Sequence, residues 1–289
     1  MMQGYFKEGK VQQKVVFDLF YRQNPCGNGF AIAAGLEQVI EYIQNLHFSP
    51  DDIDYLRSLN MFDEDFLATL RNFRFRGNMY AIPEGTVVFP NEPLLRIEAS
   101  IFEAQLLETA LLNIVNHQTL IATKAARIVK AAGGKPVLEF GSRRAQGMDA
   151  ALYGARAAVI GGCEATSNTL AGKRFGIPVR GTHAHSWVLS FPSELEAFRA
   201  YARMFPDSCL LLVDTYDTLR SGLPNAIQVA KELKAQGHRF AGIRLDSGDL
   251  AYLSKMARKM LDEAGFPDAI IVASSDLNEE VIADLRLQG

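Results

Sequence analysis

The feature that most constrains the fold is a series of six short apolar runs in residues 136–278. Each run is followed directly by glycine or polar residues, and helix-forming stretches separate most of them. Strands that alternate with helices predict an α/β fold with a parallel sheet whose strands are buried on both faces. The runs are PVLEFGSRRAQG (136–147), AAVIGGCEATSN (157–168), IPVRGTHAHS (177–186), CLLLVDTYDT (209–218), FAGIRLDSGDL (240–250) and AIIVASSDLN (269–278).

Two architectures fit this alternation, a β/α barrel and an open doubly wound sheet. The polar residues follow the apolar ones, at the strand ends where β/α barrels hold their chemistry. An open doubly wound sheet usually has a glycine-rich first turn, and the GxGxxG motif is absent. Six runs are too few to close an ordinary eight-stranded barrel, so we expect an irregular, incomplete β/α barrel over residues 100–289, with the open doubly wound sheet as the competing architecture.

Residues 1–99 predict a separate N-terminal mixed α/β domain. Residues 15–22 and 29–35 are strand-like, with a turn at Gly27 and Gly29 between them. A helix is predicted from Ser49, because proline and acidic residues follow this potential N-cap. Residues 79–99 predict two or three short strands.

A long helix is predicted to connect the two domains. Ser100 and Glu103 have the spacing of a capping box, and apolar residues then recur at helical intervals up to Gly133. The length is unusual for a globular protein, so a break near Asn116 and His117 is one possibility.

The composition predicts a protein that acts on small molecules. A chain of 289 residues with 48% hydrophobic residues can bury a large core. The net charge is −3 and no block of basic residues is present, so we expect no nucleic-acid partner. The three scattered cysteines suit a reducing compartment, and no apolar run has membrane-spanning length or the form of a signal peptide. These features predict a cytoplasmic protein that does not bind membranes.

The predicted strand ends combine arginines with aspartates. Arginine binds carboxylates and phosphates through two parallel hydrogen bonds, while aspartates hold ribose hydroxyls or water-bridged Mg²⁺. The mixture favours a phosphorylated sugar carried with magnesium, although any one of these charges can equally be a solvated or structural group. The strand-end residues are Glu139, Arg143, Arg144, Asn168, Arg180, His183, His185, Asp214, Asp217, Arg244, Asp246 and Asp249.

His183 and His185 allow three interpretations. Residues two apart on a strand point the same way, so the pair can bind one metal, as in amidohydrolase barrels. The only later histidine is His238, in a predicted helix-to-strand turn, which leaves such a metal site poorly supplied with ligands. A phosphate-handling or nucleophilic role is favoured over the metal site, and a packed histidine is the remaining alternative.

Five motifs in order carry a resemblance to a known family. They are ETALLNIVNHQTLIATKAARI, EFGSRRAQG, GTHAHSW, VDTYDT and RLDSGDL. Together with FDLFYRQNPCGNGFAIAAGLEQ near the start, they resemble the nicotinate phosphoribosyltransferases, which are type II phosphoribosyltransferases. The resemblance runs through essentially the whole chain. It implies condensation of nicotinate with phosphoribosyl pyrophosphate to nicotinate mononucleotide and pyrophosphate, coupled to ATP hydrolysis through a phosphohistidine.

The resemblance also implies roles for individual residues. The family motif Gly-Thr-x-x-His places the phosphohistidine at His185 and leaves His183 at a variable position. Phe140 would stack on the pyridine ring, and Arg143 would face the substrates. Asn168 would lie near the carboxylate of nicotinate, where nicotinamide-using relatives have an aspartate that would repel this group.

The remaining residues implied by the resemblance bind the phosphorylated sugar. Asp214, Arg244 and Asp246 would line its pocket, and the two aspartates would organise Mg²⁺ through water or substrate. Arg144 and Ser186 are further substrate-binding candidates. With His185, Arg244 and Asp246 are the predicted catalytic residues. The ring nitrogen of nicotinate is itself the nucleophile, so no strong general base is required.

The resemblance implies Mg²⁺ as cofactor, ATP as co-substrate and a homodimer with shared active sites. Family members have a Thr-Asp-x-Tyr segment before the start of this sequence and a glycine-rich phosphate-binding turn after its end, so we expect a chain truncated at both ends. Two alternatives remain: a nicotinamide- or quinolinate-using relative, and an inactive fragment that only binds ligand.

Overall fold

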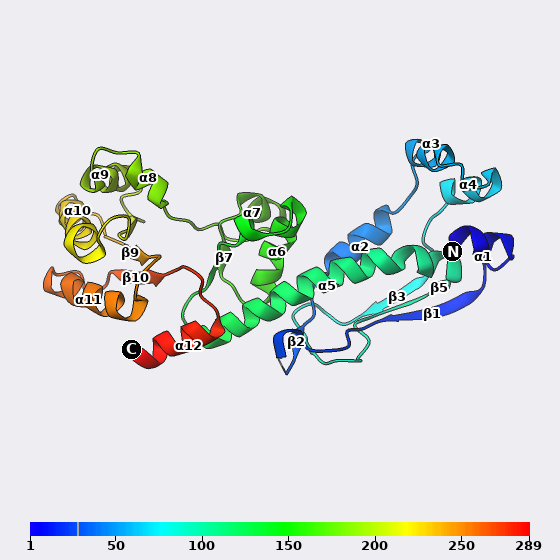
Figure 1. Ribbon diagram of the computed structural model, residues 1–289, viewed down its shortest axis with the longest axis horizontal. Helices are drawn as coiled ribbons and strands as arrows, with labels where there is room; N and C mark the ends of the chain where they lie inside the picture. The colour runs from blue at the N-terminus through cyan, green and yellow to red at the C-terminus, as the bar shows by residue number, and fades with distance from the viewer. Residues whose placement is uncertain (28) are drawn as a thin grey trace. The chain divides into compact units, whose positions relative to one another are not determined.

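The computed structural model describes residues 1–27 and 29–289, without the side chain of Cys26 (Figure 1). The turn predicted at Gly27 and Gly29 includes Asn28 and so lies partly outside the described residues. The chain forms two compact units, Met1–Val129 with Lys135–Val179, and Lys130–Gly134 with Arg180–Gly289. The predicted domain boundary after residue 99 stays a prediction.

An antiparallel sheet forms the first part of the first unit. Its strands, in the order β1-β5-β3, are β1 (Lys14–Leu19), β5 (Leu95–Ser100) and β3 (Asn78–Ala81). A second antiparallel pair joins β2 (Ala31–Ile32) to β4 (Val87–Val88). These elements confirm the strands predicted in 15–22, 29–35 and 79–99. Figure 1 shows β1, β3 and β5 along the first part of helix α5 (Ile101–Ala132), with which they share a core.

Four shorter helices accompany this sheet. They are α1 (Met2–Lys7), α2 (Leu36–Asn45), α3 (Pro50–Ser58) and α4 (Glu64–Arg71). The predicted N-cap of α3 is confirmed, because the Ser49 hydroxyl accepts a hydrogen bond from the Asp52 amide while the Asp52 carboxylate accepts one from the Ser49 amide.

Helix α5 begins at the predicted capping box. The Ser100 hydroxyl accepts from the Glu103 amide at 3.3 Å, and the Glu103 carboxylate accepts from the Ser100 amide at 3.1 Å. The helix continues to Ala132 without the break considered at residues 116–117. Neither of those residues is proline or glycine, and the buried Val115 and Gln118 continue the packed face across this point.

A parallel pair of strands completes the first unit. It consists of β6 (Leu138–Glu139) and β7 (Ala165–Thr166), with a 3₁₀ turn, η2 (Ser142–Arg144), and helix α6 (Met148–Ile160) between them; helix α7 (Thr169–Phe175) follows.

The prediction of a strand from residue 157 is wrong. Residues 157–160 are the last turn of α6, because the buried Ala157 and Ala158 continue its packed face up to Gly161. Gly161 lies so close to α5 that a Cβ atom there would overlap the Ala122 carbonyl oxygen. The strand in this run is limited to β7.

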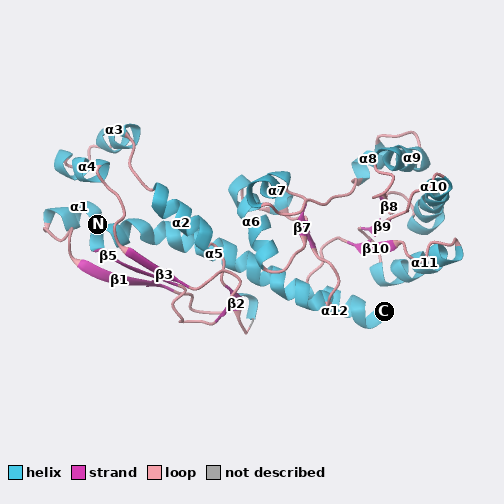
Figure 2. Ribbon diagram, turned by 180° about the vertical axis from the view of Figure 1, so that it is seen from behind, coloured by secondary structure: helices cyan, strands magenta, loops and turns pink. Residues whose placement is uncertain are grey.

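The second unit contains a parallel sheet with the order β10-β9-β8. Its strands are β8 (Leu210–Leu212), β9 (Gly242–Leu245) and β10 (Ile270–Ala273), confirming three of the predicted runs. Figure 2 shows the strands among helices α9 (Glu194–Met204), α10 (Leu223–Ala235) and α11 (Leu250–Glu263). Helices α8 (His185–Leu189) and α12 (Glu279–Gln288) and a π-helical turn, η3 (Thr218–Gly222), complete this unit.

The predicted α/β class is confirmed, and the described residues form no closed barrel. Five of the six runs contain strands in parallel pairs, while the run 177–186 contributes a single bridge between Val179 and Thr166. From His185 that run is helical, in α8. Across the described ranges, no helix combines the length and apolar character needed to cross a membrane.

Candidate active site

A histidine–aspartate pair lies beyond the carboxyl end of β8. His185 begins α8, and its Nε2 atom lies 3.1 Å from Oδ1 of Asp214, which follows β8 by two residues. The histidine side chain is 38% exposed and the aspartate side chain only 2%. With the carboxylate accepting, Nε2 carries the proton and Nδ1 keeps its lone pair. The pair therefore fixes the orientation of a partly exposed imidazole.

The second carboxylate oxygen of Asp214 is held by the next strand end. Oδ2 accepts hydrogen bonds from the Asp246 amide at 2.8 Å and from the Ser247 hydroxyl at 2.6 Å. Leu212 of β8 pairs with Arg244 of β9, so the parallel register places the residues after each strand side by side. Both oxygens of this buried carboxylate are thus fixed by the chain.

Arg244 and Asp246 lie at the same end of the sheet. The Arg244 side chain is largely buried and donates to the Thr182 hydroxyl, and its Nη2 lies 3.7 Å from Oδ1 of Asp246. The Asp246 carboxylate also accepts from the Ser274 hydroxyl at 2.5 Å. The structure therefore brings together His185, Asp214, Arg244 and Asp246, four of the residues selected from the sequence.

The metal-site interpretation of His183 and His185, which was the less favoured one, finds no support in their surroundings. His183 is buried, its Nε2 accepts from the Leu212 amide at 3.1 Å, and its ring packs 4.7 Å from that of Tyr201. Burial lowers the pKa of His183 to about 4; a backbone hydrogen bond with Ala184 opposes this shift, and the charge of Arg244 adds to it. The alternation of a strand does not apply, because His185 already belongs to a helix. The two histidines form no shared metal site.

The residues fit magnesium only through water or substrate. Among the described residues, no three histidine, cysteine, aspartate or glutamate side chains are grouped to hold a metal ion. Asp214 has both oxygens engaged, which fits poorly with direct coordination. The Asp246 side chain is 31% exposed and fits better as a group that meets a hydrated ion.

The predicted ring-binding residues lie in the first unit, beyond β6. Phe140 is 38% exposed, and Arg143 and Arg144 are exposed in the turn η2. Glu139 shapes this segment by accepting from the Gly141 amide and, at 2.6 Å, from the Thr166 hydroxyl. The segment presents an aromatic ring and two cations to solvent within this unit.

Asn168 is the N-cap of α7. Its Oδ1 accepts from the Ala171 amide at 3.1 Å, and its Nδ2 donates to the Ala151 carbonyl at 3.4 Å. An aspartate could accept the first bond and could not donate the second. The structure thus gives Asn168 a structural role, and its contact with a substrate carboxylate stays a prediction.

The other strand-end candidates differ in their surroundings. Ser186 is exposed in the first turn of α8, next to His185. Asp217 accepts from the amides of Leu219 and Arg220, and Asp249 accepts from that of Tyr252. These two aspartates cap helices. They are thus structural groups, which was one of the interpretations that the sequence left open for each strand-end charge.

The sequence did not identify three hydroxyl groups that complete the site. Thr182, Ser247 and Ser274 hold Arg244, Asp214 and Asp246 respectively. Each lies within one of the six apolar runs. Nothing local shows which hydroxyl will meet which charge, because the partners are 28 to 62 residues apart.

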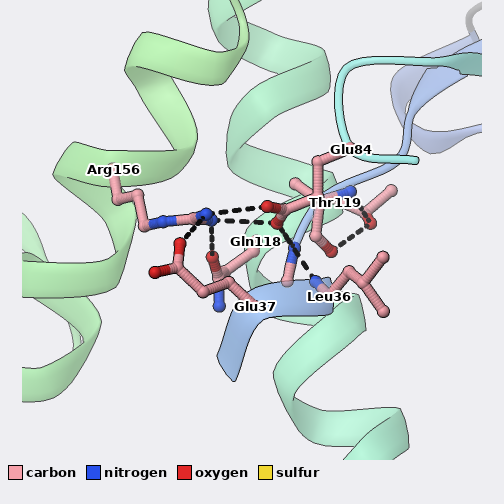
Figure 3. A network of polar contacts seen from close by, with 8 residues as sticks. Leu36, Glu37, Glu84, Gln118, Thr119 and Arg156 are labelled. Carbon is pink, nitrogen blue, oxygen red and sulfur yellow. Dashed lines mark hydrogen bonds and ion pairs between the residues drawn. The ribbon is translucent and has the colours of Figure 1, made fainter. Parts of the chain in front are cut away.

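The first unit contains a second polar network, which no sequence pattern predicted (Figure 3). Arg156 of α6 contacts Glu84, Glu37 and Gln118, and Glu84 also accepts from the amides of Gly35 and Leu36 at the start of α2. Burial alone would raise the pKa of Glu84, but these donors together lower it. The network joins α2, α5 and α6 to the segment before β4.

Comparisons with known proteins agree with this fold. A human nicotinic acid phosphoribosyltransferase structure superposes with a TM-score of 0.93 at 35% identity, covering 100% of this chain and 69% of that one. A nicotinate-nucleotide pyrophosphorylase structure from Pyrococcus furiosus gives a TM-score of 0.79 at 26% identity, covering 98% and 65%. These structures define the fold class as that of the phosphoribosyltransferases of pyridine nucleotides.

Sequence comparison gives the family. The nicotinate phosphoribosyltransferase (NAPRTase) N-terminal domain model matches residues 1–116, and the NAPRTase family model matches residues 136–285. The Bacillus subtilis nicotinate phosphoribosyltransferase is 58% identical over 291 residues, and the Mycobacterium tuberculosis enzyme pncB2 is 48% identical over 287. The chain belongs to the nicotinate phosphoribosyltransferase family, as the motifs predicted. The two matches include 100% and 99% of this chain, which spans only 59% and 61% of the length of the Bacillus subtilis and Mycobacterium tuberculosis proteins.

Proposed function

We propose that the protein forms nicotinate mononucleotide and pyrophosphate from nicotinate and phosphoribosyl pyrophosphate, with ATP hydrolysis coupled through phosphorylated His185. The observation that carries the proposal is the His185–Asp214 pair, an accessible imidazole anchored by a buried carboxylate. The names of the relatives support the same substrates.

In the phosphorylation step, Nδ1 of His185 attacks the terminal phosphorus of ATP. The N–P bond forms as the bond to the bridging oxygen breaks, and ADP leaves. Asp214 retains its hydrogen bond to Nε2–H and stabilises the positive charge that develops on the ring. Water later hydrolyses the phosphohistidine and releases phosphate.

In the transfer step, the ring nitrogen of nicotinate attacks C1 of the ribose, and pyrophosphate leaves with the electrons of the broken C–O bond. No proton has to be removed. Arg244 binds the anionic substrate beside Asp246, while Phe140 stacks on the pyridine ring and Arg143 and Arg144 attract its carboxylate. Ser186 and Asn168 complete the proposed binding residues.

Magnesium, when bound, neutralises phosphate charge and stabilises the leaving pyrophosphate. Asp246 would hold it through water, and Asp214 would orient the Asp246 backbone. The proposal includes a cytoplasmic homodimer with shared active sites.

Formation of nicotinate mononucleotide with and without ATP tests the proposal. We expect more product with ATP, and ³²P from the terminal phosphate of ATP on His185. His185→Ala should abolish the label and the stimulation by ATP. Asp214→Asn should lower the labelling rate about 100-fold, because the anionic anchor of the imidazole is lost. Label that persists in His185→Ala would contradict the assignment.

The second candidate is a relative that uses nicotinamide or quinolinate, and the likeness to the Pyrococcus furiosus pyrophosphorylase supports considering it. That structure is 26% identical to this chain, whereas the Bacillus subtilis nicotinate phosphoribosyltransferase is 58% identical, so the second candidate is the weaker one. The same assay with each base separates them, since we expect product from nicotinate alone. If no base gave product, the remaining interpretation would be an inactive protein that only binds ligand. Direct binding of phosphoribosyl pyrophosphate would then support that interpretation.

A further inference from the structure

Two contacts of the segment 183–185 share one sequence offset. His183 meets Leu212, and His185 meets Asp214, so both pairs are 29 residues apart. The segment therefore meets residues 212 and 214 in the same order along the chain, through side-chain hydrogen bonds and without strand pairing.

The Leu212 amide faces the open side of the sheet. Strand β8 is at the end of the order β10-β9-β8, and the next amide, that of Val213, donates to Arg244 of β9. Successive amides of a strand point to opposite sides, so the Leu212 N–H points away from β9. The His183 Nε2 atom supplies the acceptor that a further strand would otherwise provide.

The surroundings of His183 keep it in the accepting form. The imidazole is enclosed by Tyr201 and Phe198, at ring distances of 4.7 and 5.9 Å, and is only 7% exposed. The pKa of about 4, lowered by burial, keeps the ring neutral near pH 7. In a protonated ring Nε2 would carry a hydrogen that faces the Leu212 N–H, and the hydrogen bond would be lost.

We propose that His183 is a positioning residue for the phosphorylation of His185. By accepting the edge amide of Leu212, it sets the register in which His185 meets Asp214. The inference rests on the proposed function. Thr182, which precedes His183, accepts a hydrogen bond from Arg244. Arg244 belongs to β9, so this contact does not set the position of the segment along β8.

Two substitutions separate the acceptor from the bulk of the side chain. His183→Leu fills much of the space and leaves the Leu212 amide without an acceptor. His183→Gln places an amide oxygen close to the position of Nε2. His238→Gln is the matched control, because this histidine pairs with Asp207 at the surface, in the turn before β9.

The rate of ³²P transfer from ATP to His185 is measured together with the ratio of product formation rates with and without ATP. We expect His183→Leu to slow labelling about tenfold and to bring the ratio toward one. His183→Gln should label within about threefold of the wild-type rate, and His238→Gln should match the wild type. Thermal unfolding of each variant establishes that it is folded at the assay temperature.

Four results would overturn the inference. Wild-type labelling in His183→Leu would show that the acceptor is not needed. Equal losses with and without ATP, which leave the ratio unchanged, would show a merely structural role, as would failure of His183→Gln to restore labelling. A wild-type protein that makes product but takes no label would refute the phosphohistidine step of the proposed function and this inference with it.

Discussion

At the scale of single residues, burial divides two histidines that are neighbours in sequence. His183 is enclosed among aromatic rings and accepts a backbone amide, whereas His185 is accessible and donates to a carboxylate. The same side chain is thus a structural acceptor in one position and a candidate nucleophile two residues later. The environment of His183 also sets how the protein responds to pH.

Acid should destabilise the protein through His183. Its pKa is lowered from 6.5 to about 4 in the folded state, so the unfolded chain binds more protons between these values. The stabilisation is therefore complete above about pH 6.5 and is lost as the pH falls toward 4, by about 3 kcal/mol in the free energy of unfolding. Urea unfolding at several pH values measures it.

His183→Gln provides the comparison for this prediction, since it keeps an acceptor and removes the titrating group. Its stability should fall less than that of the wild type between pH 6.5 and 4. Parallel pH dependence of the two proteins would show that other groups dominate the acid response.

At the scale of elements, side-chain hydrogen bonds decide how the helices are joined. Glu84 caps the start of α2 through two backbone amides and also pairs with Arg156 of α6, in a place where both side chains are largely buried. In the second unit, hydroxyl groups in the loops hold the charged residues that follow the strands. Neither set of hydrogen bonds follows a helix or strand periodicity in the sequence, and both join elements that are distant in the sequence.

Glu84→Gln should reduce the free energy of unfolding by about 2 kcal/mol, because among the described residues it leaves Arg156 the more exposed Glu37 as its anionic partner. Glu41→Gln is the control. Its partner Arg174 and Glu41 itself are both exposed, so we expect a change below about 0.5 kcal/mol. Urea denaturation of both variants gives the comparison, and equal losses would show that burial of the Glu84 pair adds nothing.

At the scale of the whole molecule, we expect a homodimer. The family resemblance implies shared active sites, and the sheet β1-β5-β3 exposes Val16 and Tyr80 by more than half of their surface. Sedimentation velocity across a range of concentrations tests this expectation, because a dimer that dissociates on dilution shows a falling sedimentation coefficient. A monomer at all concentrations, with full activity, would contradict the shared sites.

The sequence by itself determined those features whose cause is local. The caps at Ser49 and Ser100 follow from side chains three residues away, and the alternation of apolar runs with helical stretches predicts parallel strands. Ordered motifs identified the family. Short apolar runs remained ambiguous, because the four residues 157–160 suit a buried helix turn as well as a strand.

Only the tertiary structure decided which polar residues meet. The parallel register of β8 and β9 brings Asp214 beside Asp246, 32 residues later, while Asp217 and Asp249 turn back to cap helices. A hydrogen bond forms where a donor and an acceptor lie within about 3 Å of each other. Distances of this kind between remote residues are fixed by strand pairing and core packing, which no local pattern in the sequence encodes.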